Sequence, residues 1–162
     1  RESVYQKDYT DLLNDYLHNE LHMKHTSVAT SSGNLSGYWK WDKNDGYIPA
    51  GAIISNLTDM AQYLSLMMNY QDDYIHRPLQ HIRRINANSS FNYKMGVRLD
   101  EIGMCWIYDS EHHIYWHNGG TSNYNSYMGF TEDGTKGIVM LSNYGPFADV
   151  PVTVIGVKEL IQ

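Results

Sequence analysis

Several features that mark particular classes of protein are scarce or missing in this sequence. Its 162 residues include one cysteine, which excludes an internal disulfide. No apolar run approaches the roughly 20 residues that a membrane-spanning helix needs. Internal repeats and low-complexity tracts do not occur. A single globular domain of ordinary size is therefore the simplest organisation, with 42% hydrophobic residues to build its core.

Positive charge is also in short supply. Twelve Lys and Arg residues stand against eighteen Asp and Glu residues, so the formal net charge is −6. No long run of basic residues occurs anywhere in the chain. Because nucleic-acid surfaces are built from clustered Lys and Arg, the sequence argues against a nucleic-acid partner.

The one cysteine, Cys105, lies in the apolar stretch "GMCWIY". A cysteine inside a strand-like apolar run behaves as a small hydrophobic residue more often than as a reactive thiol. We therefore predict that Cys105 is buried and unreactive. Aromatic residues, in contrast, are plentiful, with 14 Tyr and 4 Trp. They predict a well-packed interior or a groove lined by rings.

The first part of the chain has a helical pattern almost from its first residue. Apolar residues recur at helical spacing between Val4 and Leu17, so we predict a helix there. Because the pattern starts so abruptly, we expect the natural polypeptide to continue upstream. Residues 23–37 are rich in Ser, Thr, Asn and Gly and are predicted to be irregular.

A second helix is predicted after a loop at Pro49–Gly51. Ser55 is its candidate N-cap, and Asp59 falls in the first turn, where the helix dipole favours negative charge. The residues that we expect to form its buried stripe are Leu57, Met60, Ala61, Leu64 and Met68.

The second half of the sequence has the texture of β-strands. A short helix is predicted around 79–85, and five strand-like runs follow: "YKMGVRL", "MCWIYD", "HHIYWH", "SYMGF" and "GIVMLSN". Asp133-Gly134 predicts a hairpin between the last two runs, and Asp149 with Pro151 predicts the start of a C-terminal helix. Sequential strands joined by short turns form antiparallel sheets. The predicted fold is therefore mixed α/β (α+β), an antiparallel sheet flanked by helices.

The stretch "YWHNGGTSNYNSYMGF" is the strongest candidate for a functional site. We place Gly119 and Gly120 at the start of a strand, where glycine lets a ligand or another backbone come close. A backbone N–H there can donate to an oxyanion, and His117 would point into the same space. From the spacing alone, a tight turn with a capped histidine is the favoured interpretation.

Two histidine pairs have a spacing that a metal site could use. His18 and His22 lie four residues apart on the first predicted helix, and His113 and His117 lie four apart on a strand that also carries Glu111. No third ligand is evident for the first pair, and strand geometry spreads the second set far apart. Solvated or capping histidines are the simpler interpretation, and we expect neither a metal nor an organic cofactor.

Three ordered segments together resemble a known family. The segments "LHMKHTSV", "GYIPAGAIISNLTDMAQYLSLMMN" and "YWHNGGTSNYNSYMGFTEDGTKGIVMLSN" are similar to the serine β-lactamase and penicillin-binding protein superfamily. The similarity is greatest to the class C β-lactamase-like branch, with its D-alanyl-D-alanine carboxypeptidases, esterases and D-amino-acid peptidases. It covers the chain from Ser3 onward and implies part of a β-lactamase/transpeptidase-like fold.

The resemblance also implies roles for individual residues. His117, Asn118 and Gly119 occupy the positions of the family's third motif, with His117 where many relatives have lysine. Gly120 would supply an oxyanion-hole N–H, so His117 and Gly120 are the implied catalytic residues. Asn118, Gly119 and Thr121 would line the substrate. Glycine at these positions would leave room for the acyl group to lie along the strand.

The family's nucleophile is missing from this sequence. Relatives attack with the serine of a Ser-x-x-Lys motif, and none of the lysines here has a serine three residues before it. A Tyr-x-Asn motif is missing as well. The two Ser-x-Asn matches, at Ser32 and Ser90, follow the "LHMKHT" segment, whereas the family's second motif precedes it. Residues 1–162 are therefore expected to be the C-terminal portion of such a domain.

Two functions remain open at this point. The first is the C-terminal part of a serine hydrolase that works through an acyl-enzyme. Its substrate would be a small molecule or a peptide, and the bond it cleaves a peptide, ester, amide or β-lactam bond. Its partner would be a companion N-terminal fragment of the same protein, or a second copy by self-association. The second is a catalytically inactive relative that senses a ligand or serves a structural role. From the resemblance, we expect a location outside the cytoplasm, at the bacterial cell envelope or secreted.

Overall fold

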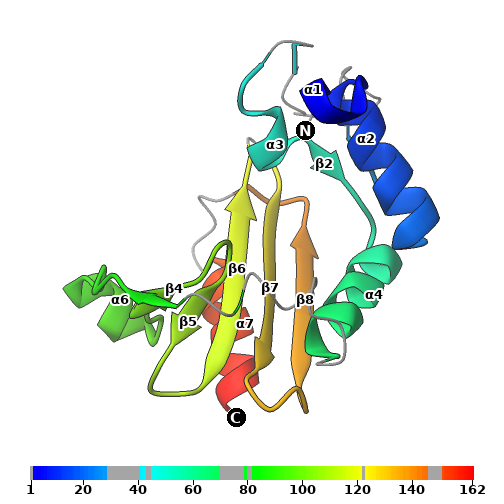
Figure 1. Cartoon of the computed structure of the whole chain (residues 1–162). Helices are drawn as coiled ribbons and strands as arrows, with labels where there is room; N and C mark the ends of the chain where they lie inside the picture. The colour runs from blue at the N-terminus through cyan, green and yellow to red at the C-terminus, as the bar shows by residue number, and fades with distance from the viewer. Residues whose placement is uncertain are drawn as a thin grey trace.

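The computed structural model describes residues 2–28, 41–42, 45–69, 79, 82–121, 123–145 and 151–162. Within these residues the main feature is an antiparallel sheet of six strands in the order β3-β4-β5-β6-β7-β8 (Figure 1). The strands are β3 (Arg83–Arg84), β4 (Glu101–Ile102), β5 (Ile107–Asp109), β6 (Ile114–Gly120), β7 (Asn125–Thr131) and β8 (Gly137–Ser142). Spatial order follows chain order, so the sheet is a meander and the predicted α+β fold class is confirmed.

Both faces of the sheet are covered by apolar packing. On one face, α7 (Val152–Ile161) packs Val154, Val157 and Leu160 against β6 and β7. On the other, α4 (Leu57–Met68) packs Leu64 and Met67 among the rings of β5, β6 and β7. Because side chains alternate along a strand, neighbouring residues of β6 belong to different cores. Figure 1 shows α7 behind the sheet and α4 beside β8.

The N-terminal part forms a separate layer next to α4. It contains α1 (Glu2–Tyr5), α2 (Tyr9–Asp15), the π-helix η1 (Tyr16–Glu20), α3 (Ile48–Gly51) and a two-stranded sheet of β1 (Ser27–Val28) and β2 (Ile53–Ile54). The predicted first helix is present, but as three short pieces. Buried Leu17, Leu21 and Met23 pack this layer against α4.

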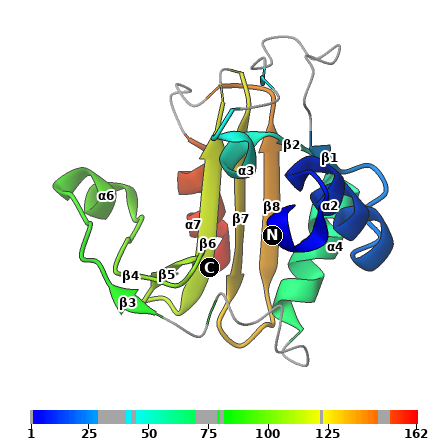
Figure 2. The ribbon, with the colours of Figure 1, turned by 45° about the horizontal axis from the view of Figure 1, so that its top comes forward.

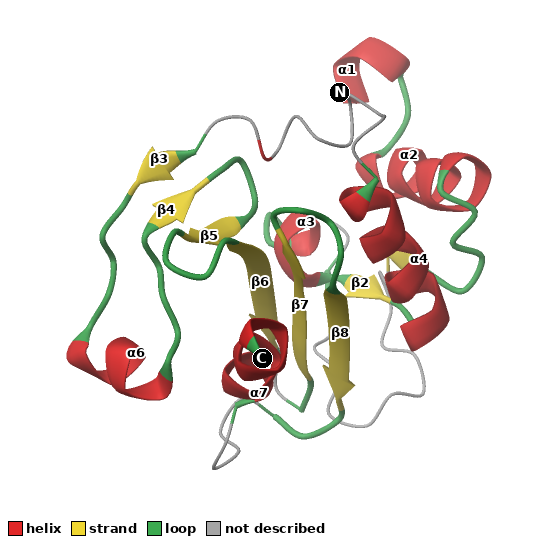
Figure 3. Cartoon of the chain, turned by 90° about the horizontal axis from the view of Figure 1, so that it is seen from below, coloured by secondary structure: helices red, strands yellow, loops and turns green. Residues whose placement is uncertain are grey.

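An arm leads away from the sheet between β3 and β4. It carries α6 (Ser90–Met95), which stands clear of the other elements in Figure 2. Figure 3 shows the arm on one side of the sheet and the layer of α2 and α4 on the other. At the base of the arm, Asp100 accepts hydrogen bonds from Arg98, Asn88 and Ser110. Burial raises the pKa of Asp100, but these hydrogen bonds outweigh it and leave the pKa below its ordinary value.

Four of the five runs predicted to be strands do contain strands. The prediction for the first run, "YKMGVRL", is wrong. Residues 93–95 end helix α6 instead of forming a strand. A capping box between Ser89 and Asn92 starts this helix, and Gly96 ends it with a left-handed φ of 73°. These local signals override the strand-like composition. The helix predicted around 79–85 is also wrong in its described part, because Arg83–Arg84 form β3.

Several smaller predictions need correction. Pro49–Gly51 is not a loop but part of α3, where proline occupies the first turn as its fixed φ favours. The cap of α4 is Asn56, not Ser55, and its side chain accepts the Asp59 N–H at 2.9 Å. Asp59 does lie in the first turn of α4, as predicted.

The predicted stripe of α4 is only partly correct. Leu64 is buried as predicted, but Leu57 is 57% exposed. Met67, which was not part of the predicted stripe, is buried. Cys105 is exposed, not buried, because it lies in the turn between β4 and β5 and not inside a strand. The C-terminal helix is present with Pro151 as its N-cap, while Asp149 lies outside the described residues.

Candidate active site

The second half of strand β6 has a strand neighbour on one side only. Strand β5 pairs with β6 from Ile114 to Trp116, whereas β7 pairs with every residue of β6 up to Gly120. From His117 to Gly120, the edge of β6 that faces away from β7 has no strand partner in the described part of the chain. We call this segment the open edge of β6.

Hydrogen bonds at the two ends of the β6–β7 pair show which backbone groups lie on the open edge. Thr121 N–H donates to Tyr124 O at 2.9 Å, and Glu132 N–H donates to His113 O at 2.8 Å. Antiparallel pairs alternate between residues that bond to each other and residues that bond outward. Odd-numbered residues of β6 therefore bond to β7, and the N–H and C=O groups of Asn118 and Gly120 point to the open edge.

Side chains of this segment alternate between the two faces of the sheet. His117 lies on the same face as Tyr115, which packs in the core beneath α4. The imidazole of His117 is exposed and has no hydrogen-bond partner among the described residues. Asn118 lies on the opposite face, the face of α7, and is also exposed. The structure thus places His117 and Gly119 on one face, and Asn118 and Gly120 on the other.

Gly119 lies against its cross-strand neighbour. Its register partner is Ser126, and a Cβ atom at position 119 would come 3.0 Å from Ser126 Oγ. A side chain at position 119 would therefore press on Ser126, so the packing of β6 on β7 favours glycine here quite apart from any ligand. Gly119 and Gly120 end strand β6, so their predicted place at the start of a strand is wrong. Thr121 follows directly, half-buried and held by its bond to Tyr124.

A buried polar cluster joins the first two of the three segments on which the family resemblance rests. Thr26 and Asp59 are 1% and 4% exposed. Thr26 Oγ1 donates to Asp59 Oδ2 at 2.7 Å, and the His25 N–H donates to the same oxygen at 2.8 Å. Thr26 Oγ1 also lies 2.7 Å from Ser55 Oγ. These hydrogen bonds join the segments around Thr26 and Asp59, which lie about 30 positions apart in the sequence.

One histidine of each pair considered as metal ligands has another contact. His18 Nε2 lies 2.8 Å from the backbone oxygen of Thr26, which positions η1 over that segment. His113 Nδ1 lies 3.0 Å from Glu132 Oε2 and 3.0 Å from the Tyr108 hydroxyl. Among the described residues, no group of three or more His, Cys, Asp or Glu could hold a metal ion.

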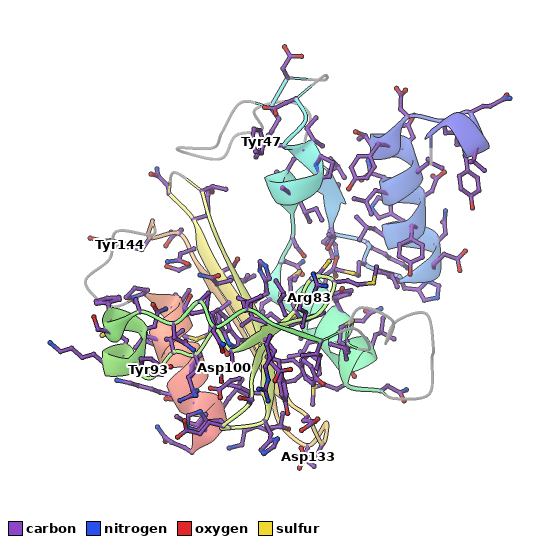
Figure 4. All side chains as sticks on the ribbon, turned by 60° about the vertical axis from the view of Figure 1, so that its left-hand side comes forward. Tyr47, Arg83, Tyr93, Asp100, Asp133 and Tyr144 are labelled. Atoms are coloured by element: carbon purple, nitrogen blue, oxygen red, sulfur yellow. The ribbon has the colours of Figure 1, made fainter. Side chains whose placement is uncertain are left out.

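A hollow of ≈ 370 Å³ lies beside His113, at the other end of the sheet from the open edge. Its lining residues are His112, His113, Thr131, Glu132 and Asp133. Strand geometry places His113 roughly 13 Å from His117. In Figure 4, Asp133 lies at the opposite end of the molecule from Tyr47. Burial and a hydrogen bond to Glu132 raise the pKa of Tyr108 at this hollow, so its hydroxyl stays protonated.

Comparison with known proteins identifies the family. The model of the Beta-lactamase family matches residues 2–157, and the chain therefore belongs to the β-lactamase family. No match was found among curated proteins. The resemblance stated from the three sequence segments is thus confirmed.

Solved structures with the same fold include three hydrolases. A β-lactamase/D-alanine carboxypeptidase from Yersinia pestis, crystallised with citrate, has a TM-score of 0.74 at 17% identity over 99% of this chain and 50% of its own. A D-amino acid amidase from Ochrobactrum anthropi SV3 has a TM-score of 0.63 at 19% identity over 99% and 51%. A D-stereospecific amidohydrolase from Streptomyces sp. has a TM-score of 0.64 at 15% identity over 95% and 49%. The chain spans about half the length of each.

Proposed function

We propose that this chain forms one wall of the active site of a serine hydrolase that works through an acyl-enzyme. The observation that carries the proposal is the position of the Gly120 N–H, which points to the open edge of β6 beside the exposed His117. Membership of the β-lactamase family supports the chemistry. A serine hydrolase needs a fixed donor where negative charge develops on the carbonyl oxygen of its substrate.

In this proposal each residue has one task. The Gly120 N–H donates to the oxyanion, and loss of one such donor costs about 10²–10³ in kcat in well-studied enzymes. His117 hydrogen-bonds the substrate or the transition state from the α4 face. Asn118 presents its backbone groups to the substrate along the open edge, and Gly119 keeps the strand flat against β7. Thr121 holds the end of the strand in place.

The nucleophile comes from outside this chain. No Ser-x-x-Lys occurs in the sequence, and the solved relatives are about twice as long. We propose a companion N-terminal fragment of the same protein as its source, at the cell envelope or in a secreted complex. The three relatives carry the names of a β-lactamase/D-alanine carboxypeptidase, a D-amino acid amidase and a D-stereospecific amidohydrolase. We therefore favour amide or peptide substrates with a D-residue over esters.

Substitutions at His117 test this function directly. The protein is expressed from its own gene together with the sequence upstream of Arg1, and kcat/KM is measured on a D-alanyl amide. His117→Ala should lower kcat/KM at least 100-fold, and His117→Lys should restore most of it, because lysine can donate the same hydrogen bond. His113→Ala, in the turn just before β6 and outside the site, is the matched control and should leave kcat/KM unchanged.

The second function is that of a catalytically inactive relative that senses a ligand or serves a structural role, and it requires that the upstream part of the gene also has no Ser-x-x-Lys. The same experiment separates the two. Equal kcat/KM for His117→Ala and the unsubstituted protein would remove His117 from catalysis. No turnover by either protein, although both are folded, would favour the inactive relative.

A further inference from the structure

Gly119 interrupts the row of side chains on the α4 face of the sheet, directly beside the open edge of β6. Apart from the chain neighbours of Gly119, one atom of the described residues lies within 4 Å of the position that a Cβ atom would take there. That atom is Ser126 Oγ, at 3.0 Å. Strands β6 and β7 run side by side in Figure 1, and Ser126 is the register partner of Gly119. We call the position of this Cβ atom the Gly119 notch.

Ser126 has a fixed backbone and a hydroxyl that can bond a ligand. Odd-numbered residues of β6 bond to β7, so the backbone groups of Gly119 and Ser126 bond to each other. The side chain of Ser126 is half-buried, and its hydroxyl has no hydrogen-bond partner among the described residues. A group that lies across Gly119 would therefore meet a hydroxyl whose position is set by the sheet.

The separation of 3.0 Å favours one kind of atom in the Gly119 notch. Carbon atoms rest about 3.5–4.0 Å from their neighbours, so a carbon in the notch would press on Ser126 Oγ. Hydrogen bonds between two oxygen atoms measure roughly 2.5–3.0 Å. An oxygen atom that accepts the Ser126 hydroxyl therefore fits where a carbon atom does not.

The open edge of β6 lies one strand spacing from the notch. A substrate that pairs with the outward backbone groups of Asn118 and Gly120 would run about 4.8 Å from β6. Its side chain must therefore span about 5 Å before a terminal oxygen reaches the Gly119 notch. An extended glutamine or glutamate side chain spans about that distance, whereas the methyl group of alanine stops well short of it.

We propose that Ser126 is a specificity-determining residue. Its hydroxyl donates to the terminal oxygen of a substrate side chain of glutamine or glutamate length that lies across Gly119. His117 borders the same space, because it is the diagonal neighbour of Ser126 across the strand pair, with about 7–8 Å between the two residues. This inference rests on the proposed function and names the substrate side chain that the same site prefers.

Two chromogenic substrates with side chains of similar length test the role of Ser126. The protein is expressed with the sequence upstream of Arg1, and kcat/KM is measured on the p-nitroanilides of D-glutamine and D-methionine. Methionine has no oxygen at the end of its side chain. The unsubstituted protein should favour the glutamine substrate about tenfold, which corresponds to one hydrogen bond. Ser126→Ala should remove this preference, and Ser126→Thr should retain it because threonine keeps the hydroxyl.

Ser142→Ala is the matched control. Ser142 lies on β8 and on the opposite face of the sheet, and its hydroxyl oxygen accepts the Tyr144 N–H at 3.0 Å. This variant should keep the preference for the glutamine substrate. A loss of kcat/KM in Ser126→Ala that is equal for both substrates would show that the serine has a structural role only, and would overturn the inference.

The remaining outcomes separate this inference from the proposed function. Equal use of the two substrates by the unsubstituted protein would overturn the role of Ser126. Turnover of a D-alanyl amide but of neither longer substrate would overturn it as well. In both cases turnover itself would leave the proposed function standing. No turnover of any of the three substrates by the folded protein would disprove the proposed function and this inference with it.

Discussion

At the scale of single residues, the packing around Tyr127 shows how closely the sheet and α7 fit together. The ring leaves no room for a Cβ atom at Gly156, where one would come 2.2 Å from the ring. Its hydroxyl is buried and has no hydrogen-bond partner among the described residues. Burial is the main reason that the pKa of Tyr127 is raised, and the nearby Asp109 carboxylate adds to the effect.

Removal of this hydroxyl should therefore stabilise the protein. Tyr127→Phe is expected to raise the free energy of unfolding by about 1 kcal/mol, because a buried polar group without a partner is unfavourable. Tyr108→Phe is the matched control: its hydroxyl donates to Glu132 Oε2 at 2.8 Å, and its loss should lower stability by about 1 kcal/mol. Urea denaturation measures both. A stability loss in Tyr127→Phe as large as that in Tyr108→Phe would show that the hydroxyl has a partner after all.

At the scale of secondary-structure elements, the sequence predicted those whose pattern is strong over many residues. Strands β6, β7 and β8 and helices α4 and α7 were recognised because alternation or helical spacing runs through them. Helix α6 was missed because its signals are caps, not periodicity. The exposure of Cys105 was missed because a turn of a few residues interrupts an apolar run.

The contact between Thr26 and Asp59 was also missed, because it joins two segments that no sequence pattern links. Thr26→Val should lower the free energy of unfolding by about 1–3 kcal/mol, since it removes one of the two hydrogen bonds that the buried Asp59 Oδ2 accepts and leaves only the one from the His25 N–H. Thr135→Val removes an exposed hydroxyl bonded to Asp133 and serves as the control, with a change below about 0.5 kcal/mol. Denaturant midpoints for the two variants that agree within error would contradict a structural role for the cluster.

At the scale of the whole molecule, we propose that the chain presents one side of a reaction site. The sequence predicts His117 to Thr121 as its residues, but not how they divide between the faces of the sheet. That division follows from the β6–β7 register, which depends on pairing partners that a sequence pattern does not name. The open edge of β6 depends on how far β5 extends, and β5 ends its pairing at Trp116. Neither feature could be obtained from local sequence.

We propose that this chain shapes an acyl-transfer site whose nucleophile lies on another polypeptide segment. Intact-mass spectrometry after treatment with a fluorescent penicillin or a phosphonate shows which segment carries the nucleophile. We expect no adduct on this chain alone, and an adduct on a companion segment with Ser-x-x-Lys when the gene is expressed with its upstream sequence. A covalent adduct on the isolated chain of residues 1–162 would place the nucleophile here and disprove the proposal.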